Sequence, residues 1–356
     1  MTINLKDVVL PLNNVLLPNK LNNLKLYNSF SKYTFCLIYL VIVAGGVVRM
    51  TGSGMGCPDW PKCFGLWVPP ISANQINWSP NTEYNTSQML IHNDILWVSN
   101  SKFTSTNNFV RKNWDRYKKH DYAKFNVAHT WTEYINRCIG AIAGFASLIL
   151  LLIALTTNKK ILVFFSVLLL FLMGFQAWMG MKVVESILSP IMITIHMLIA
   201  LLILGLVLFL KQISTASKSL FTNSLLYRLL IGSLIISIVQ IVLGTQVREG
   251  VDLLLKDISK SEIVTISIPI FYTHRLVAWF VLISNLLLIY IARDIKDASS
   301  HVYIISIVLF CLLGTGILMT YFAFPGLAQL LHLVCAVTLF LVQIDMLFKY
   351  HYYSIE

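Results

Sequence analysis

Apolar residues form long runs along this chain, separated by short polar segments. Crossing a hydrocarbon core about 30 Å thick takes about 20 helical residues, and these runs are continuous rather than alternating, unlike the strands of a membrane β-barrel. We therefore expect an all-α polytopic membrane protein. Its eight transmembrane helices are predicted at residues 33–50, 131–156, 160–181, 189–211, 223–246, 270–292, 301–322 and 327–349.

The eight predicted helices divide into two similar sets of four. The first and fifth share a Gly-x3-Arg ending at Arg49 and Arg248, the third and seventh can be matched at Gly174 and Gly314, and the fourth and eighth each carry one histidine. Because each set has an even number of spans, both sets have the same orientation. The repeat predicts two pseudo-symmetric four-helix bundles about an axis along the membrane normal.

The repeat also sets the expected domains. They are an N-terminal arm at 1–32, an N-terminal half at 33–211 and a C-terminal half at 212–356. The N-terminal half contains the one long polar connection, 51–130, which is rich in Asn, Ser, Thr and Trp. We expect this connection to be an outer loop or small cap, too polar to form a core of its own.

Composition agrees with a membrane location, since 57% of residues are hydrophobic and 12% charged, against about a quarter charged in soluble domains. The net charge of +11 is spread over loops and the N-terminal arm, which argues against a nucleic-acid partner. Lysine and arginine are concentrated on the side of the N-terminus, so we expect both termini in the cytoplasm. The arm lacks arginine and includes Asp7, which argues against a signal or transit peptide.

Four polar positions become equivalent under the repeat: Asn136, His196, His274 and His332. Each falls within about two turns of the outer helix end, so all four are expected at one depth. A single intramembrane histidine usually serves packing, but three at symmetric positions favour a ligand role. A histidine pair on facing helices can hold haem iron, and we expect His274 and His332 to form one. Zinc, by contrast, needs three or four protein ligands close together.

Four arginines flank these positions. A guanidinium can fork onto a carboxylate, which predicts clamps for haem propionates, although an arginine near the interface can simply extend to water. The four are Arg49, Arg137, Arg248 and Arg275.

Glu133 lies one turn before Asn136 and so shares its helix face. The matching position in the other half is Phe271. A carboxylate in one site only marks that half as the reactive one, although Glu133 could instead complement the helix dipole. His129, one turn further back, is expected in a loop.

Two cysteines, Cys57 and Cys63, follow the first helix in the outer segment. Their spacing is compatible with a disulfide in an oxidising compartment, and a redox-active role stays open. The four other cysteines fall in helices, where a buried thiol is normally a small apolar residue. These are Cys36, Cys138, Cys311 and Cys335.

Taken together, these motifs resemble the haem A synthase family over residues 33–349. The resemblance rests on Gly45 to Gly54, the Cys57 to Cys63 segment, Glu133 to Arg137, Tyr272 to Arg275, and the helices of His196 and His332. It implies an enzyme that holds a haem b cofactor in the C-terminal half. Its substrate would be haem O, bound in the N-terminal half, whose C8 methyl group is oxidised to a formyl group through hydroxylated intermediates to give haem A.

The resemblance also implies residue roles. Glu133 would be the essential carboxylate, and the cysteine pair a disulfide or an aid to haem transfer. The haem b site would comprise His274, His332, Arg275 and Arg248; the substrate site would comprise His196, Asn136, Arg137 and Arg49. Many members carry histidine where this chain has Asn136. Because an amide is a poor iron ligand, we expect His196 alone to bind the haem O iron.

A bacterial cytoplasmic membrane is the location that the resemblance implies, with haem O synthase and cytochrome oxidase assembly factors as partners; a homo-oligomer stays open. Two other functions fit the residues. A transmembrane b-type cytochrome for electron transfer would explain the histidines but not Glu133, and a haem-transfer or assembly protein without turnover would explain the cysteines and arginines.

Overall fold

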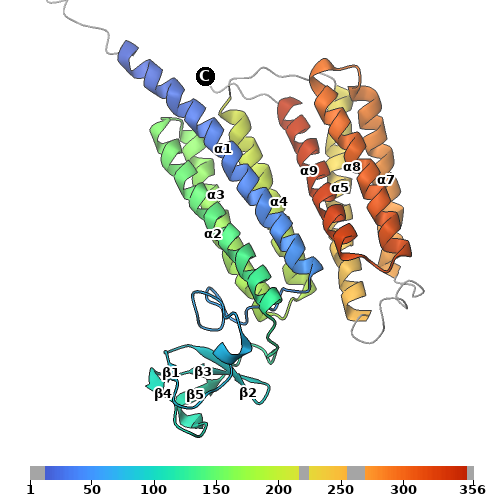
Figure 1. Cartoon of the computed structure of the whole chain (residues 1–356). Coiled ribbons are helices and arrows are strands. Elements are labelled where there is room, and N and C mark those ends of the chain that lie inside the picture. Colours follow the sequence, from blue (N-terminus) through green and yellow to red (C-terminus); the bar gives the residue numbers. More distant parts are fainter. Residues whose placement is uncertain (1–12, 216–223, 255–268, 351–356) are drawn as a thin grey trace, which may run out of the picture.

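The computed structural model describes residues 13–215, 224–254 and 269–350. Within these ranges, eight helices are long and apolar enough to cross a membrane, which confirms the expected all-α polytopic membrane protein (Figure 1). Parts of the predicted N-terminal arm and of the connection after the fifth span lie outside the described residues. The helices are α1 (Asn13–Met50), α2 (Val127–Thr156), α3 (Lys160–Glu185), α4 (Pro190–Ile213), α5 (Ser224–Leu254), α7 (Pro269–Ala292), α8 (Ser299–Tyr321) and α9 (Gly326–Tyr350), with a 3-10 turn, η3 (Lys296–Ala298), before α8.

The largest differences from the predicted helix boundaries are at α1 and α5. Helix α1 begins at Asn13 instead of residue 33, and α5 continues to Leu254 instead of ending at 246. Helical hydrogen bonding continues through polar residues at the membrane boundary. A prediction based on apolar runs ends the helix where those polar residues begin. Arg248 consequently lies inside a helix, where it forms an i,i+4 ion pair with Asp252.

The helices pack as two groups of four. In the first group α1 and α3 each contact both α2 and α4, and in the second α5 and α8 each contact both α7 and α9. Helix α9 joins the groups by packing on α1 and α4. At Gly46 of α1 a Cβ atom would lie 2.7 Å from a methyl group of Leu330 on α9, so glycine permits this close approach. Symmetry between the two groups stays a prediction.

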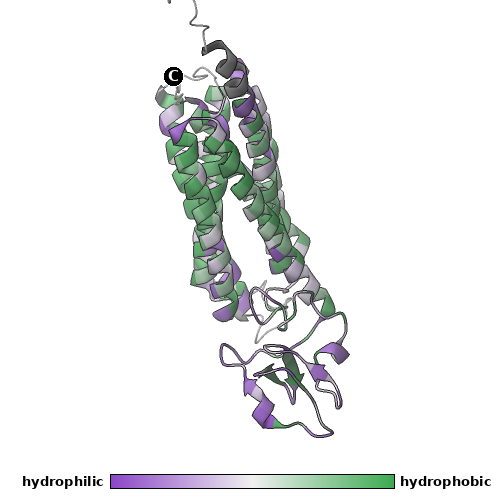
Figure 2. Cartoon of the chain, turned by 90° about the vertical axis from the view of Figure 1, so that its left-hand side faces the viewer, coloured by the Kyte–Doolittle hydropathy of each residue, from purple (hydrophilic) through white to green (hydrophobic). Residues whose placement is uncertain are grey.

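Residues of both helix groups are hydrophobic along most of the helices' length (Figure 2). Phe145, Phe171 and Phe310 are 64%, 66% and 79% exposed. Large exposed phenylalanines on long helices are unfavourable in water and favourable in lipid, which agrees with a bilayer around the helices.

A small β-containing subdomain fills the connection between α1 and α2. Strands β1 (Glu83–Tyr84) and β4 (Phe103–Thr104) pair antiparallel, and an antiparallel sheet has the order β2-β3-β5. The other elements are β2 (Met89–His92), β3 (Ile95–Ser99), β5 (Trp114–Arg116) and two 3-10 turns, η1 (Ala73–Gln75) and η2 (Arg111–Asn113). The subdomain lies at the end of the helices opposite to the start of α1 and the end of α9 (Figure 1).

The expectation that this segment lacks a core is wrong. One buried cluster includes both disulfide cysteines and the Phe64 ring, and a second is mainly aromatic. Aromatic side chains bury large areas per residue, so a segment of polar average composition can still form a core. The buried members are Cys57, Cys63, Phe64, Ile76, Met89 and Leu96 in the first cluster and Tyr84, Leu90, Trp97 and Trp114 in the second.

Candidate functional site

The His274 and His332 rings face one another across the second helix group, with centroids 6.4 Å apart. Two imidazoles that bind one metal ion from opposite sides, at about 2 Å each, have centroids roughly 6 Å apart. The observed separation therefore fits an iron between the rings. Within the described ranges, no three His, Cys, Asp or Glu side chains are grouped to hold a metal ion.

Thr315 of α8 sets the protonation of His332. Its hydroxyl donates to the Cys311 carbonyl at 2.7 Å and lies 2.9 Å from Nδ1 of His332. Because its one proton is used, the hydroxyl accepts from Nδ1–H, which leaves Nε2 with a free lone pair. This is the usual arrangement of a metal-binding histidine. Thr315 was not singled out from the sequence, although a threonine between two glycines in an otherwise apolar run is a signal for it.

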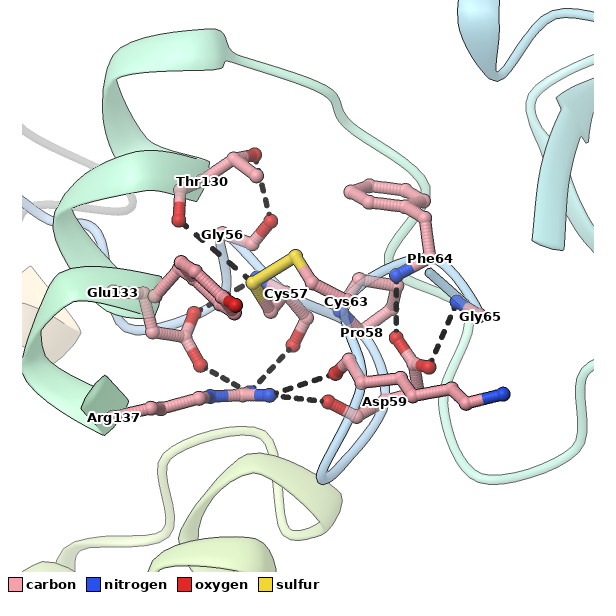
Figure 3. Close-up of a disulfide and its surroundings, with 12 residues drawn as sticks. Gly56, Cys57, Pro58, Asp59, Cys63, Phe64, Gly65, Thr130, Glu133 and Arg137 are labelled. Carbon is pink, nitrogen blue, oxygen red and sulfur yellow. Dashed lines mark hydrogen bonds and ion pairs between the residues drawn. A yellow bond between two sulfur atoms is a disulfide. The ribbon is translucent and has the colours of Figure 1, made fainter. Parts of the chain in front are cut away.

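Glu133 is buried at the point where α2 meets the subdomain (Figure 3). Its Oε2 accepts the backbone N–H of Cys57 at 2.8 Å, and its Oε1 pairs with Arg137 at 2.5 Å. The Arg137 guanidinium also donates to the carbonyls of Asp59 at 2.6 Å and Lys62 at 2.9 Å. Both side chains are thus bound to the loop that follows α1. A contact from Arg137 to a propionate stays a prediction.

The cysteines Cys57 and Cys63 form a disulfide, as their spacing allowed. The chain packs tightly before it: a Cβ atom at Gly56 would lie 2.4 Å from the His129 carbonyl oxygen, so only glycine fits. Thr130 adds a hydrogen bond to the Gly56 carbonyl at 2.8 Å. His129 itself lies in the first turn of α2, not in a loop as expected. The helix begins earlier because Asn126 caps it.

The Asp59 carboxylate closes the loop from its other side (Figure 3). It accepts the backbone N–H groups of Phe64 at 2.6 Å and Gly65 at 2.9 Å. Burial raises the pKa of Asp59, and these hydrogen bonds oppose the rise only in part. Asp59 was not singled out from the sequence.

Two of the predicted propionate clamps come together. Arg49 of α1 and Arg248 of α5 both pair with Asp252, at 2.5 and 2.7 Å, and Arg248 also donates to Gln329 at 2.6 Å. One carboxylate therefore joins the arginines of both helix groups. Arg275 is separate: it is exposed and its guanidinium lies over the Phe271 ring.

The first helix group holds His196 on α4 and Asn136 on α2. Nδ1 of His196 and Oδ1 of Asn136 are buried and lack hydrogen-bond partners among the described residues. Buried polar atoms are normally bonded, so both mark places where a bound group would be accommodated. His332 and His196 each face a glycine, Gly316 and Gly180, on the preceding helix.

Residues 29–104 and 98–344 match the model of a family described as cytochrome oxidase assembly protein. A haem A synthase of Shewanella oneidensis is 27% identical over 170 residues, 47% of this chain and 39% of that protein. One from Orientia tsutsugamushi (strain Boryong) is 28% identical over 152 residues, 42% and 35% of the two chains. One from Geobacillus kaustophilus is 46% identical over 41 residues, 11% and 13%.

These matches span less than half of each curated relative, and no solved structure matches the chain. The family model nevertheless covers nearly all of the helical region described above. The chain therefore belongs to the cytochrome oxidase assembly family, in agreement with its similarity to haem A synthases.

Proposed function

We propose that this chain is a haem A synthase, which oxidises the C8 methyl group of haem O to a formyl group. The observation that carries the proposal is the difference between the two helix groups. One contains a buried, fixed carboxylate at Glu133, and the other contains the His274–His332 pair, whose rings lie 6.4 Å apart. The first suits chemistry on a substrate, and the second suits a permanently bound cofactor.

The overall reaction balances as R–CH3 + O2 → R–CHO + H2O. The methyl carbon loses four electrons, and dioxygen is the oxidant that accepts them. A haem b held by His274 and His332 would supply one-electron transfer. Arg248 is the proposed propionate ligand on that side, and its buried Nε, which has no partner among the described residues, supports this role.

The residues of the first helix group have distinct roles in this proposal. His196 would hold the iron of haem O, and the amide of Asn136 would not add a second strong ligand. Glu133 accepts the protons released from the reacting carbon, as a positioned carboxylate can. Arg137 and the Cys57 N–H hold that carboxylate in one orientation. The propionates of haem O are the proposed ligands of Arg49.

A bacterial cytoplasmic membrane with both termini in the cytoplasm is the proposed location. The described ends of α1 and α9 share one face, as this topology requires (Figure 1). The proposed partners are haem O synthase, as the source of substrate, and cytochrome oxidase assembly factors, as acceptors of haem A.

The test is product identification. The full chain is produced in cells that make haem O and lack their own haem A synthase, and the extracted haems are identified by mass. Haem A, or its hydroxylated precursor, is the expected product. Two unmodified haem B molecules per chain would favour an electron-transfer cytochrome, and bound haem O that stays unmodified in oxygen would favour a transfer protein; either result contradicts the proposal.

A further inference from the structure

Two glutamines on different helices make the same contact with a histidine. The side-chain amide of Gln176 on α3 donates to the backbone carbonyl of His196 on α4 at 2.9 Å, and that of Gln240 on α5 donates to the carbonyl of His274 on α7 at 3.0 Å. Each glutamine thus reaches the histidine of the next helix along the chain. The contact occurs once in each helix group.

A glycine one turn after each glutamine faces the same imidazole. A Cβ atom at Gly180 would lie 3.6 Å from Cε1 of His196, and one at Gly244 would lie 3.3 Å from Cε1 of His274. The glycine therefore lies directly beside the ring, while the glutamine holds the backbone from which the ring projects. Together they form a Gln-x3-Gly unit.

The α8–α9 pair has the glycine without the glutamine. Gly316 faces Cε1 of His332 at 3.8 Å, but Leu312 stands one turn before it, and Thr315 binds the ring instead. The same number of residues separates Gly316 from His332 as separates Gly180 from His196. The sequence comparison matched Gly174 with Gly314. The structure instead makes Gly180 and Gly316 equivalent, because these are the glycines that lie beside a histidine ring.

Helix packing alone does not explain where the amides lie. A glutamine that only joined two helices could bond any carbonyl, yet both select the carbonyl of the histidine itself. Gln240 also reaches the ring, with its Nε2 at 3.2 Å from Nε2 of His274. A ring nitrogen cannot accept from an amide and bind a metal ion at once, so Gln240 would give up this ring contact when haem is bound and keep its bond to the His274 carbonyl.

We propose that Gln176 and Gln240 are equivalent positioning residues, each fixing the orientation of the principal haem ligand of its helix group. The inference rests on the proposed function. It adds that the orientation of His196 is fixed by the protein in the same way as that of His274. Groups that orient metal-binding histidines typically change metal affinity 10–100-fold when removed. The unit on α3 therefore prepares His196 before haem O arrives.

The test uses Gln240→Met and Gln176→Met in the purified full chain, because methionine has the length of glutamine and no N–H donor. Leu312→Met is the matched control at the equivalent position of α8. Each protein is loaded with hemin or with haem O, and haem content, dissociation rate and electron paramagnetic resonance spectrum are recorded. We expect Gln240→Met to shift the low-spin signal and speed hemin loss about ten-fold. Gln176→Met should alter only the haem O signal, and Leu312→Met neither.

Unchanged spectra and dissociation rates in both glutamine variants at full haem content would overturn the inference, as would equal changes in Leu312→Met. Should a methionine variant not fold, Gln240→Leu and Gln176→Leu copy a residue that the fold already accepts on α8, and the same outcomes apply. Failure of the unsubstituted chain to bind hemin through His274 and His332 would instead contradict the proposed function, so the two failures are distinguishable.

Discussion

The backbone N–H of Cys57 donates to the carboxylate of Glu133 at 2.8 Å. This bond joins the disulfide loop directly to the side chain proposed to act on the substrate. Arg137 strengthens the link, since it binds both the carboxylate and the loop carbonyls (Figure 3). The outer subdomain therefore positions the proposed reactive group. We expect substitutions in the disulfide loop to change the yield of haem A.

Replacing Glu133 with glutamine should stop turnover and spare haem b. The amide oxygen can still accept from Cys57 N–H, but the group no longer takes a proton at the substrate, and we expect haem A to fall on the order of 100-fold or more. Haem extraction measures product, and the reduced spectrum measures haem b. Arg137→Lys, which keeps the charge but cannot bind several carbonyls at once, is the control for loop anchoring. Normal haem A in Glu133→Gln would refute the assigned role.

Loss of the disulfide should loosen the anchor of Glu133. Closing so short a loop stabilises the subdomain by about 2 kcal/mol in the chain-entropy account. The Cys57→Ser, Cys63→Ser double variant should therefore exchange the Gly65 amide hydrogen faster, with lower haem A yield and unchanged haem b. Hydrogen exchange followed by mass spectrometry measures the first effect. Cys36→Ser, a free cysteine on α1, is the control and should change neither quantity.

His274→Ala and His332→Ala should each abolish the low-spin haem b signal, because either change removes an axial ligand. His301→Ala is the matched control. His301 is also a buried histidine of the second helix group, but it bonds Asp345 at 2.8 Å near the start of α8, so the signal should persist. A low-spin band that survives both alanine changes would show that other residues bind the iron.

Asn136→His should convert the substrate haem from high spin to low spin. Imidazole binds iron strongly, whereas an amide does not. Gly45, the repeat counterpart of Gly244, has nothing within 4 Å of a Cβ atom placed on it, whereas Gly244 faces the His274 ring. Spectra of the chain loaded with haem O measure the change, and activity should alter with it. A fully low-spin haem O in the unsubstituted chain would require a second strong ligand and contradict the open position.

The outer subdomain should become less stable as pH rises through the acid range. The folded state raises the pKa of Asp59 by burial, so it binds the proton more tightly than the unfolded chain does. Stability is therefore highest when the carboxyl is protonated in both states and falls as pH increases from the ordinary pKa to the raised one. Hydrogen exchange at Phe64 and Gly65, corrected for intrinsic rates, tests this. Asp59→Asn should remove the dependence, whereas an opposite slope would show that hydrogen bonds outweigh burial.

The sequence alone determined the membrane-spanning architecture. A helix in lipid must satisfy its own backbone and be apolar over about 20 residues, so the spans could be read from composition, apart from the polar ends of α1 and α5. The repeat also singled out His274 and His332, because a lone histidine in each apolar run is conspicuous. The distance between their rings then followed from the packing of the second helix group, in which α5 and α8 each contact both α7 and α9.

Only the tertiary structure decided which groups meet. Asp252 draws Arg49 and Arg248 together from separate helix groups, a contact that depends on extra turns of α5 and on how the groups pack. The aromatic core of the subdomain and the anchoring of Glu133 by Cys57 likewise join positions far apart in the chain. Apolar periodicity records which face of a helix is buried, but not the partner of a polar side chain, because hydrogen bonds and ion pairs depend on distances that only the folded chain defines.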